Sequence, residues 1–203
     1  MRPSILSAAL VLSLAVSSLR ADFVHMDGFA YHRDVAVNLF GTDETLRTGQ
    51  NLLSLNGAPD QVAYCVDLGH ALVNDWIGSL TSVTVLNNGP MVAYLYNTYA
   101  PLVNDDDSAA SLQLAIWKVI SDSPINLDFS TGNLKVPDGQ PGLAGAIAEL
   151  STLPATYGDF PPPIVVYSSD NPQSQSMLIP EPASLCLSLL AGAMLIRCRQ
   201  RRA

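Results

Sequence analysis

Hydrophobic and polar positions alternate in several short stretches of the chain, and this period of two residues predicts strands. In residues 61–68, Val62 and Tyr64 share one face of the predicted strand, while Ala63, Cys65 and Asp67 share the other. We predict strands over residues 34–40, 61–68, 82–86, 125–129 and 164–167.

Hydrophobic positions recur every three or four residues in three other stretches, which predicts helices. The strongest pattern spans residues 109–121, where the apolar positions form one stripe, and residues 104–108 precede it as a capping segment. Further helices are predicted over residues 91–99, after Pro90, and over residues 143–150. Together the patterns predict an α+β domain, with a β-sheet region and helices packed on it.

The two ends of the 203-residue chain differ from this pattern. Residues 1–21 combine Arg2, an apolar run and a final small residue, which is typical of a secretory signal peptide cleaved by signal peptidase. Residues 22–170 then form the predicted ectodomain, and residues 171–179 are interpreted as a polar stalk. An uncleaved N-terminal anchor is the alternative, but the apolar run is short for a membrane span.

Residues 180–203 contain three segments in a fixed order. Pro180, Glu181 and Pro182 come first, an apolar segment over residues 185–196 predicts a short transmembrane helix, and an arginine-rich tail ends the chain. This order resembles the PEP-CTERM sorting signal of Gram-negative bacteria. The resemblance implies processing by an exosortase and a location at the cell surface or in the extracellular matrix. An ordinary single-span anchor remains the alternative, and it also places the domain outside the cytoplasm.

Charge excludes one class of partner. Between residues 22 and 179 lie 17 of the 18 Asp and Glu, but only four of the 10 Lys and Arg. A surface this acidic cannot neutralise phosphate groups, so we expect no nucleic-acid partner.

Cysteine usage leaves the predicted ectodomain with one thiol. The chain has three cysteines, and Cys186 and Cys198 belong to the C-terminal signal. Cys65 therefore has no disulfide partner within the domain, and it is buried as a small apolar residue, used as a reactive group, or paired with a cysteine of another molecule.

Two segments around Cys65 and Gln113 indicate the second possibility. Residues 64–67 read Tyr-Cys-Val-Asp, and residues 112–117 read Leu-Gln-Leu-Ala-Ile-Trp. They resemble the paired motifs of bacterial thioester domains, which are modules of surface adhesins, although many members have Thr at the position of Leu112. The resemblance implies a thioester cross-link between Cys65 and Gln113, which would capture an amine-bearing partner covalently.

The chemistry of such a bond sets further expectations. A thiol that attacks a carboxamide needs enforced proximity, and the resulting thioester needs shelter from water. We expect Tyr64, Tyr96, Tyr99 and Trp117 to provide that shelter, and Asp67 either to form a hydrogen bond nearby or to be an ordinary strand-end residue. The partner would be a protein lysine, a polyamine or an amino sugar. Capture is stoichiometric, so the sequence predicts no enzyme and no cofactor.

Other functions of these residues stay open. Cys65 could be buried in a non-covalent structural protein of the surface, or it could serve a surface hydrolase if a histidine base lay within hydrogen-bond reach. The acidic run at residues 105–107 lacks the ligand spacing of a calcium loop, and a position at a helix N-terminus accounts for it. One thiol and scattered histidines do not match the ligand set of a zinc site, so no metal is predicted.

Overall fold

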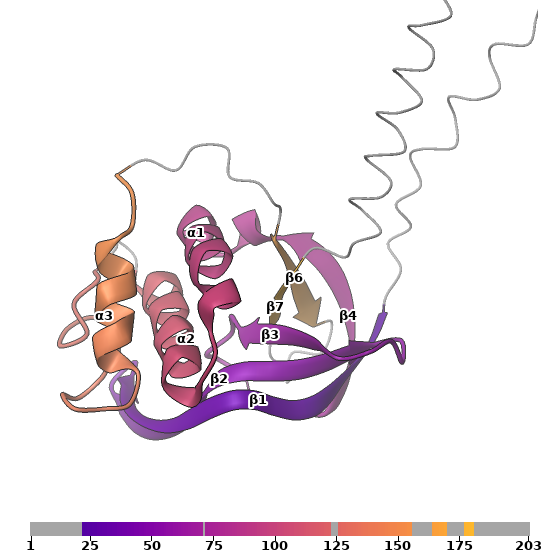
Figure 1. Cartoon of the computed structure of the whole chain (residues 1–203), viewed down its shortest axis with the longest axis horizontal. Coiled ribbons are helices and arrows are strands. Elements are labelled where there is room, and N and C mark those ends of the chain that lie inside the picture. Colours follow the sequence, from indigo (N-terminus) through magenta and orange to yellow (C-terminus); the bar gives the residue numbers. More distant parts are fainter. Residues whose placement is uncertain (1–21, 71, 123–125, 156–163, 170–176, 181–203) are drawn as a thin grey trace, which may run out of the picture.

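The computed structural model describes residues 22–70, 72–122, 126–155, 164–169 and 177–180. These residues form an antiparallel sheet with three α-helices beside it (Figure 1). The predicted combination of a sheet with packed helices is thereby confirmed.

A long hairpin forms the base of the sheet. Strand β1 (Asp22–Leu39) turns through Phe40 and Gly41 into β2 (Thr42–Leu55), and the two strands pair from Leu39–Thr42 to Val24–Leu55. Both turn residues have positive φ angles, of 51° and 90°, which suits a two-residue hairpin turn. The structure therefore extends the predicted strand at residues 34–40 towards the N-terminus, ends it at Leu39, and adds a second strand that the sequence did not predict.

In the described part of the chain, the hydrogen-bonded order of the strands closes on itself. The five strands besides the hairpin are β3 (Gln61–Cys65), β4 (Asp75–Ser82), β5 (Leu134–Lys135), β6 (Ile164–Ser169) and β7 (Met177–Pro180). The sheet order is β2-β3-β7-β6-β4-β1-β5, and β1 also pairs with β2, so the hydrogen-bonded order returns to its start. Strand β3 thus lies between β2 and β7, and its end at Cys65 pairs with Met177 of β7.

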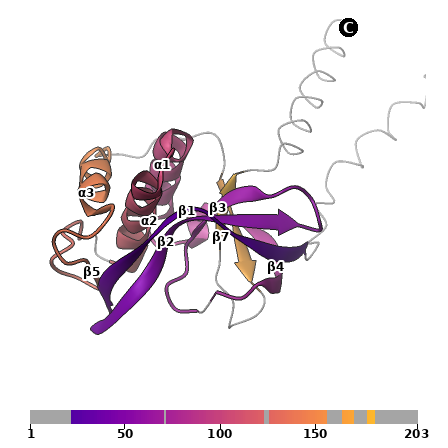
Figure 2. The same ribbon diagram turned by 60° about the horizontal axis from the view of Figure 1, so that its bottom comes forward.

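The three helices pack together on the hairpin. Figure 2 shows α1 (Gly89–Tyr99), α2 (Asp106–Ser121) and α3 (Leu143–Ser151) grouped at one end of the molecule, with β4 and β7 at the other. Helix α2 lies between the other two helices and also contacts β1, β2 and β3. All three helices confirm the sequence prediction.

Helix α2 begins where local signals place it. The side chain of Asp105 accepts a hydrogen bond from the backbone N–H of Ser108, and Ser108 bonds back to Asp105, which forms a capping box. Eleven consecutive residues, Ala109–Val119, are buried, so the helix is enclosed on all sides rather than along one stripe. Polar Gln113 and charged Lys118 are among these buried residues, and both therefore need partners inside the protein.

Two predicted strands are wrong. Residues 83–85 form a short 3₁₀ helix, η1 (Val83–Val85), because the Ser82 hydroxyl accepts the backbone N–H of Thr84. The described residues 126–129 are not a strand either, since the Asn126 side chain accepts the N–H of Asp128, and such local bonds favour turns. A second 3₁₀ helix, η2 (Ala100–Leu102), follows α1 directly.

The predicted stalk needs a correction at its C-terminal end. Residues 177–179 belong to β7, which pairs with β3 and β6, so the folded domain extends past residue 170 to Pro180, the first residue of the predicted sorting motif. The predicted signal peptide, the rest of the stalk, Glu181, Pro182 and the apolar segment at residues 185–196 lie outside the described residues. Within the described ranges, no helix has the length and apolar character needed to cross a membrane.

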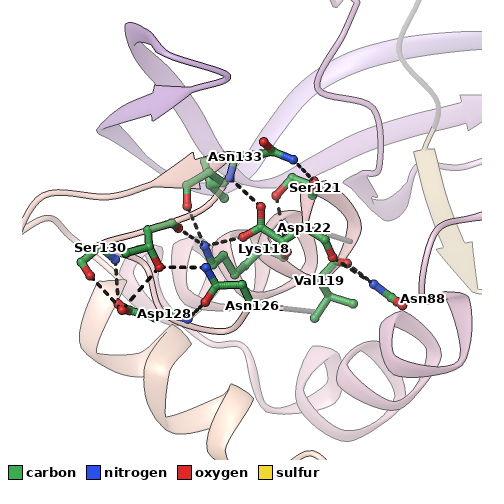
Figure 3. A network of polar contacts seen from close by, with 11 residues as sticks. Asn88, Lys118, Val119, Ser121, Asp122, Asn126, Asp128, Ser130 and Asn133 are labelled. Atoms are coloured by element: carbon green, nitrogen blue, oxygen red, sulfur yellow. Dashed lines mark hydrogen bonds and ion pairs between the residues drawn. The ribbon is translucent and has the colours of Figure 1, made fainter. Parts of the chain in front are cut away.

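A polar network closes the C-terminal end of α2 (Figure 3). Buried Lys118 forms an ion pair with Asp122 at 2.5 Å and donates hydrogen bonds to the backbone oxygens of Thr131 and Leu134. Asp122 in turn accepts the backbone N–H of Asn133, while Asn88 donates to the backbone oxygens of Val119 and Asp122. The network attaches the segment before β5 and the start of α1 to the same helix end.

The carboxyl group of Glu149 on α3 makes the stability of the folded chain depend on pH. Burial raises the pKa of Glu149 from 4.5 to about 7, so the folded chain holds this proton more tightly than the unfolded chain. Stability is therefore lost as pH rises from about 4.5 through 7. We expect E149Q to be more stable than the parent at pH 8 by about 1 kcal/mol, a value discounted for partial solvent exposure.

Thermal unfolding at pH 5 and pH 8 measures this effect. The difference in Tm between E149Q and the parent should grow by roughly 2–4 °C between these pH values. The matched control is E44Q, which makes the same substitution at an exposed glutamate. An equal difference at both pH values would contradict the prediction.

Candidate functional site

The side chain of Gln113 reaches from the middle of α2 to the end of β3. Its Oε1 accepts the backbone N–H of Cys65 at 2.9 Å, and its Nε2 donates to the backbone oxygen of Cys65 at 2.8 Å. Gln113 is 1% exposed and Cys65 is 4% exposed, so the contact is shielded from solvent. The structure thereby brings together the two residues that the sequence singled out, although they are 48 positions apart.

This pairing has a structural reason. The pairing of β3 with β2 ends at Asn51–Ala63, two residues before Cys65. The Gln113 carboxamide carries one acceptor and one donor, as a peptide group does, and it takes the place of the missing strand partner. Both hydrogen bonds fix the carboxamide beside Cys65 in a single orientation.

The sulfur of Cys65 is held by the next turn of the chain. Its Sγ donates to the backbone oxygen of Asp67 at 3.0 Å and accepts the backbone N–H of Asp67 at 3.5 Å. Burial raises the pKa of the Cys65 thiol to about 12, and the hydrogen bond from the backbone N–H of Asp67 partly opposes this rise. The thiol is therefore protonated at neutral pH.

Cys65 and Gln113 share a cavity of about 410 Å³. Trp117 lines it beside them, and Phe29, Leu68 and Leu72 supply apolar wall. Its polar wall includes Asn51, which is 3% exposed, together with Glu44, Arg47 and His70. A small molecule, or the end of a long side chain, can therefore reach the neighbourhood of both reactive groups.

The predicted shielding residues divide into two groups. Of the four aromatic residues predicted to shield the bond, only Trp117 lines the cavity with Cys65 and Gln113. Tyr64 points to the other face of β3, where its ring meets Tyr96 edge-on at 5.8 Å and its hydroxyl accepts a hydrogen bond from Gln50. Tyr99 bonds to the Thr152 hydroxyl after α3. These three tyrosines therefore build the core behind the strand rather than the cavity wall.

Asp67 has a larger role than the sequence predicted. Besides its backbone contacts to the sulfur, its carboxylate accepts the backbone N–H of Gly69 and lies 2.7 Å from Nδ1 of His70. His70 was not among the predicted site residues. The sequence signal that would have identified it is the spacing Cys-x-Asp-x-x-His directly after a strand.

The residues of the alternative sites have structural partners of their own. The hydrogen bonds of the Cys65 sulfur go to Asp67, and none joins it to a histidine in the described part of the chain. In the acidic run, Asp105 caps α2 and Asp106 and Asp107 pair with Arg33. Across residues that the structure describes, no cluster of three His, Cys, Asp or Glu side chains could hold a metal ion.

Comparisons with known proteins give structural likenesses alone. No protein-family model matches the sequence, and no curated protein matches it. Among solved structures, the chain is similar to the N-terminal thioester domain of fibronectin-binding protein SfbI from Streptococcus pyogenes, at 15% identity and a TM-score of 0.46, covering 66% of this chain and 86% of that one.

Two further solved structures belong to bacterial surface proteins. One is the N-terminal domain of the Streptococcus pyogenes pilus tip adhesin Cpa, at 18% identity and a TM-score of 0.44, covering 66% of this chain and 83% of that one. The other is the N-terminal thioester domain of a surface protein from Clostridium perfringens, at 14% identity and a TM-score of 0.45, covering 78% and 98%. With TM-scores below 0.5, the chemistry of this chain has to be argued from its own site.

Proposed function

We propose that this chain is an exported attachment module that forms a thioester between Cys65 and Gln113 and captures an amine-bearing partner through it. The observation that carries the proposal is the buried, two-bond pairing of the Gln113 carboxamide with Cys65 at the wall of a cavity. Few other roles need a carboxamide and a thiol together where a ligand can enter.

The reaction balances without a cofactor. The Cys65 sulfur attacks the side-chain carbonyl carbon of Gln113, the C–N bond breaks, and the thiol proton leaves with the amide nitrogen as ammonia. An arriving primary amine then attacks the thioester, which releases the Cys65 thiol and leaves an amide between Gln113 and the partner. Each domain reacts once, so the process is capture rather than turnover.

The geometry supports the first step in two ways. A strand and a helix that share one core are rigid supports, and fixed proximity of this kind is worth up to roughly 7–11 kcal/mol in favourable intramolecular reactions. The backbone N–H of Cys65 already points at Oε1 of Gln113, so it can stabilise negative charge that develops on this oxygen during attack.

The environment also favours a long-lived thioester. The Cys65 and Gln113 side chains are almost fully buried, and apolar residues line part of the cavity, which limits the access of water. The high pKa of the thiol makes the thiolate a poor leaving group, and this slows hydrolysis until a stronger nucleophile arrives.

The wider biological role follows from the two ends of the chain. Export through residues 1–21 and exosortase processing of residues 180–203 would place the domain on the surface or in the matrix of a Gram-negative bacterium. There the partner would be a protein lysine, a polyamine or an amino sugar.

Intact mass spectrometry of the full chain tests the proposal. We expect the native chain to be lighter by one ammonia than its sequence after any terminal processing, and to gain one methylamine on treatment with that amine. The C65A variant is the matched control, because it should show neither change. A native chain with full mass and an alkylated Cys65, located by peptide mapping because Cys186 and Cys198 also react, would contradict the thioester and favour a structural Cys65.

A further inference from the structure

Asp67 joins the reactive sulfur to an imidazole. Its backbone N–H and C=O contact the Cys65 Sγ at 3.5 and 3.0 Å, and its carboxylate contacts His70 Nδ1 at 2.7 Å. His70 lines the same cavity as Cys65 and Gln113. One residue therefore fixes a titratable ring and the sulfur relative to each other.

The Asp67 contact selects which nitrogen of His70 is free. An ionised carboxylate only accepts hydrogen bonds, so the neutral imidazole places its proton on Nδ1 and leaves the lone pair on Nε2. His70 has a 42% exposed side chain, and the Asp67 side chain is 19% exposed. The ring thus stands between solvent and the cavity, where an entering molecule would meet it.

Capture of an amine requires proton transfers that the thioester pair cannot perform alone. A primary alkylamine is mainly an ammonium ion at neutral pH and must lose a proton before it can attack. A second proton is lost from the nitrogen after attack, while the departing sulfur must gain one. Burial raises the pKa of the Cys65 thiol, which makes departure as a bare thiolate unfavourable.

Resting on the proposed thioester, we infer that His70 is the general base for the incoming amine and that Asp67 is its positioning residue. The ammonium form first loses one proton to water, and the neutral amine attacks. Nε2 of His70 then accepts the second proton from the amine nitrogen as the C–N bond to Gln113 forms and the C–S bond breaks. The imidazolium then returns this proton to the Cys65 sulfur, and the products are an amide and a thiol.

Other charged groups face this cavity from β2. Arg47 contributes positive charge, but it lies 3.4 Å from Asp34 and 5.2 Å from the Phe29 ring. Glu44 contributes negative charge to the same wall and forms no ion pair within the described ranges. Its carboxylate favours the approach of an ammonium ion, and Arg47 opposes it.

The test measures the rate of methylamine incorporation into the full chain by mass spectrometry. In H70N, we expect the ammonia deficit to remain and the capture rate to fall by roughly 10²-fold, at the lower end for a lost general base. H25N is the matched control, since His25 also pairs with an aspartate, Asp75, but does not line the cavity. Its capture rate should equal that of the parent.

A second amine separates proton transfer from structural damage. Methoxyamine is weakly basic, so its nitrogen gives up a proton to water readily after attack, and its capture should lose much less rate than that of methylamine in H70N. D67N, which keeps the backbone contacts to the sulfur but loses the carboxylate, should show the same selective loss.

Results that contradict the role of His70 differ from results that contradict the thioester itself. A capture rate for H70N within twofold of the parent, or an equal loss for both amines, would overturn the role of His70 while leaving the thioester in place. Absence of the ammonia deficit from the parent chain would overturn the thioester and, with it, this assignment.

Discussion

Replacement of Gln113 by alanine is expected to abolish covalent amine capture completely. The variant has no carboxamide carbon for Cys65 to attack, so neither the ammonia deficit nor methylamine incorporation should be seen. It should also lose about 2–4 kcal/mol of stability, because the backbone N–H and C=O of Cys65 would remain buried without partners. Mass spectrometry and denaturant unfolding measure these two effects separately.

Gln50 provides a matched control for the loss of stability. It is 5% exposed, and its side chain donates to the Tyr64 hydroxyl on the opposite face of β3. Q50A should therefore destabilise the domain while methylamine capture continues. Capture by Q113A at the parent rate would show that another group forms the acyl bond, and the proposed cross-link would then be wrong.

The parts of the fold that the sequence predicted depend on local signals. Helix α2 has its capping box and a dense run of apolar residues within one continuous segment. The strand at Cys65 was predicted from the alternation of residues 61–68, although it ends at Cys65 in the structure. Such elements can be recognised because the residues that determine them are neighbours in the chain.

Strand β2 was not predicted because its buried positions are polar. Thr48, Gln50 and Asn51 are all at most 5% exposed, and an alternation of hydrophobic residues is therefore absent from this half of the strand. Gln50 is satisfied by Tyr64, and Asn51 faces the cavity. The polar sequence of β2 thus follows from contacts made with distant residues.

The sequence predicted only part of the site, because the rest also depends on contacts between residues that are distant in the chain. Two motifs identified Cys65 and Gln113, but the wall around them depends on how β2, β3 and α2 meet. Tyr64 lies one residue before Cys65 and consequently points to the opposite face of the strand. His70 was not assigned to the cavity, because its place depends on the turn that Asp67 forms after β3.

Lys118→Met is expected to cause the largest loss of stability among substitutions outside the cavity. Lys118 is 0% exposed, and the variant would leave the Asp122 carboxylate buried without its cation. Breaking a buried pair in this way typically costs about 3–5 kcal/mol. Two backbone oxygens, of Thr131 and Leu134, would also lose their donor.

Thermal unfolding measures the expected loss as a fall in Tm of roughly 6–20 °C, given about 2–4 °C per kcal/mol for a chain of this size. R33M is the control, since the ion pair of Arg33 with Asp107 is exposed and should contribute little to stability. The double variant K118M/D122N removes the unpaired charge and should recover part of the loss. Equal Tm values for K118M and the parent would contradict a stabilising role for the pair. Because Lys118 does not line the cavity, the folded fraction of each variant should still capture methylamine, which separates the stability of α2 from the chemistry of Gln113 on the same helix.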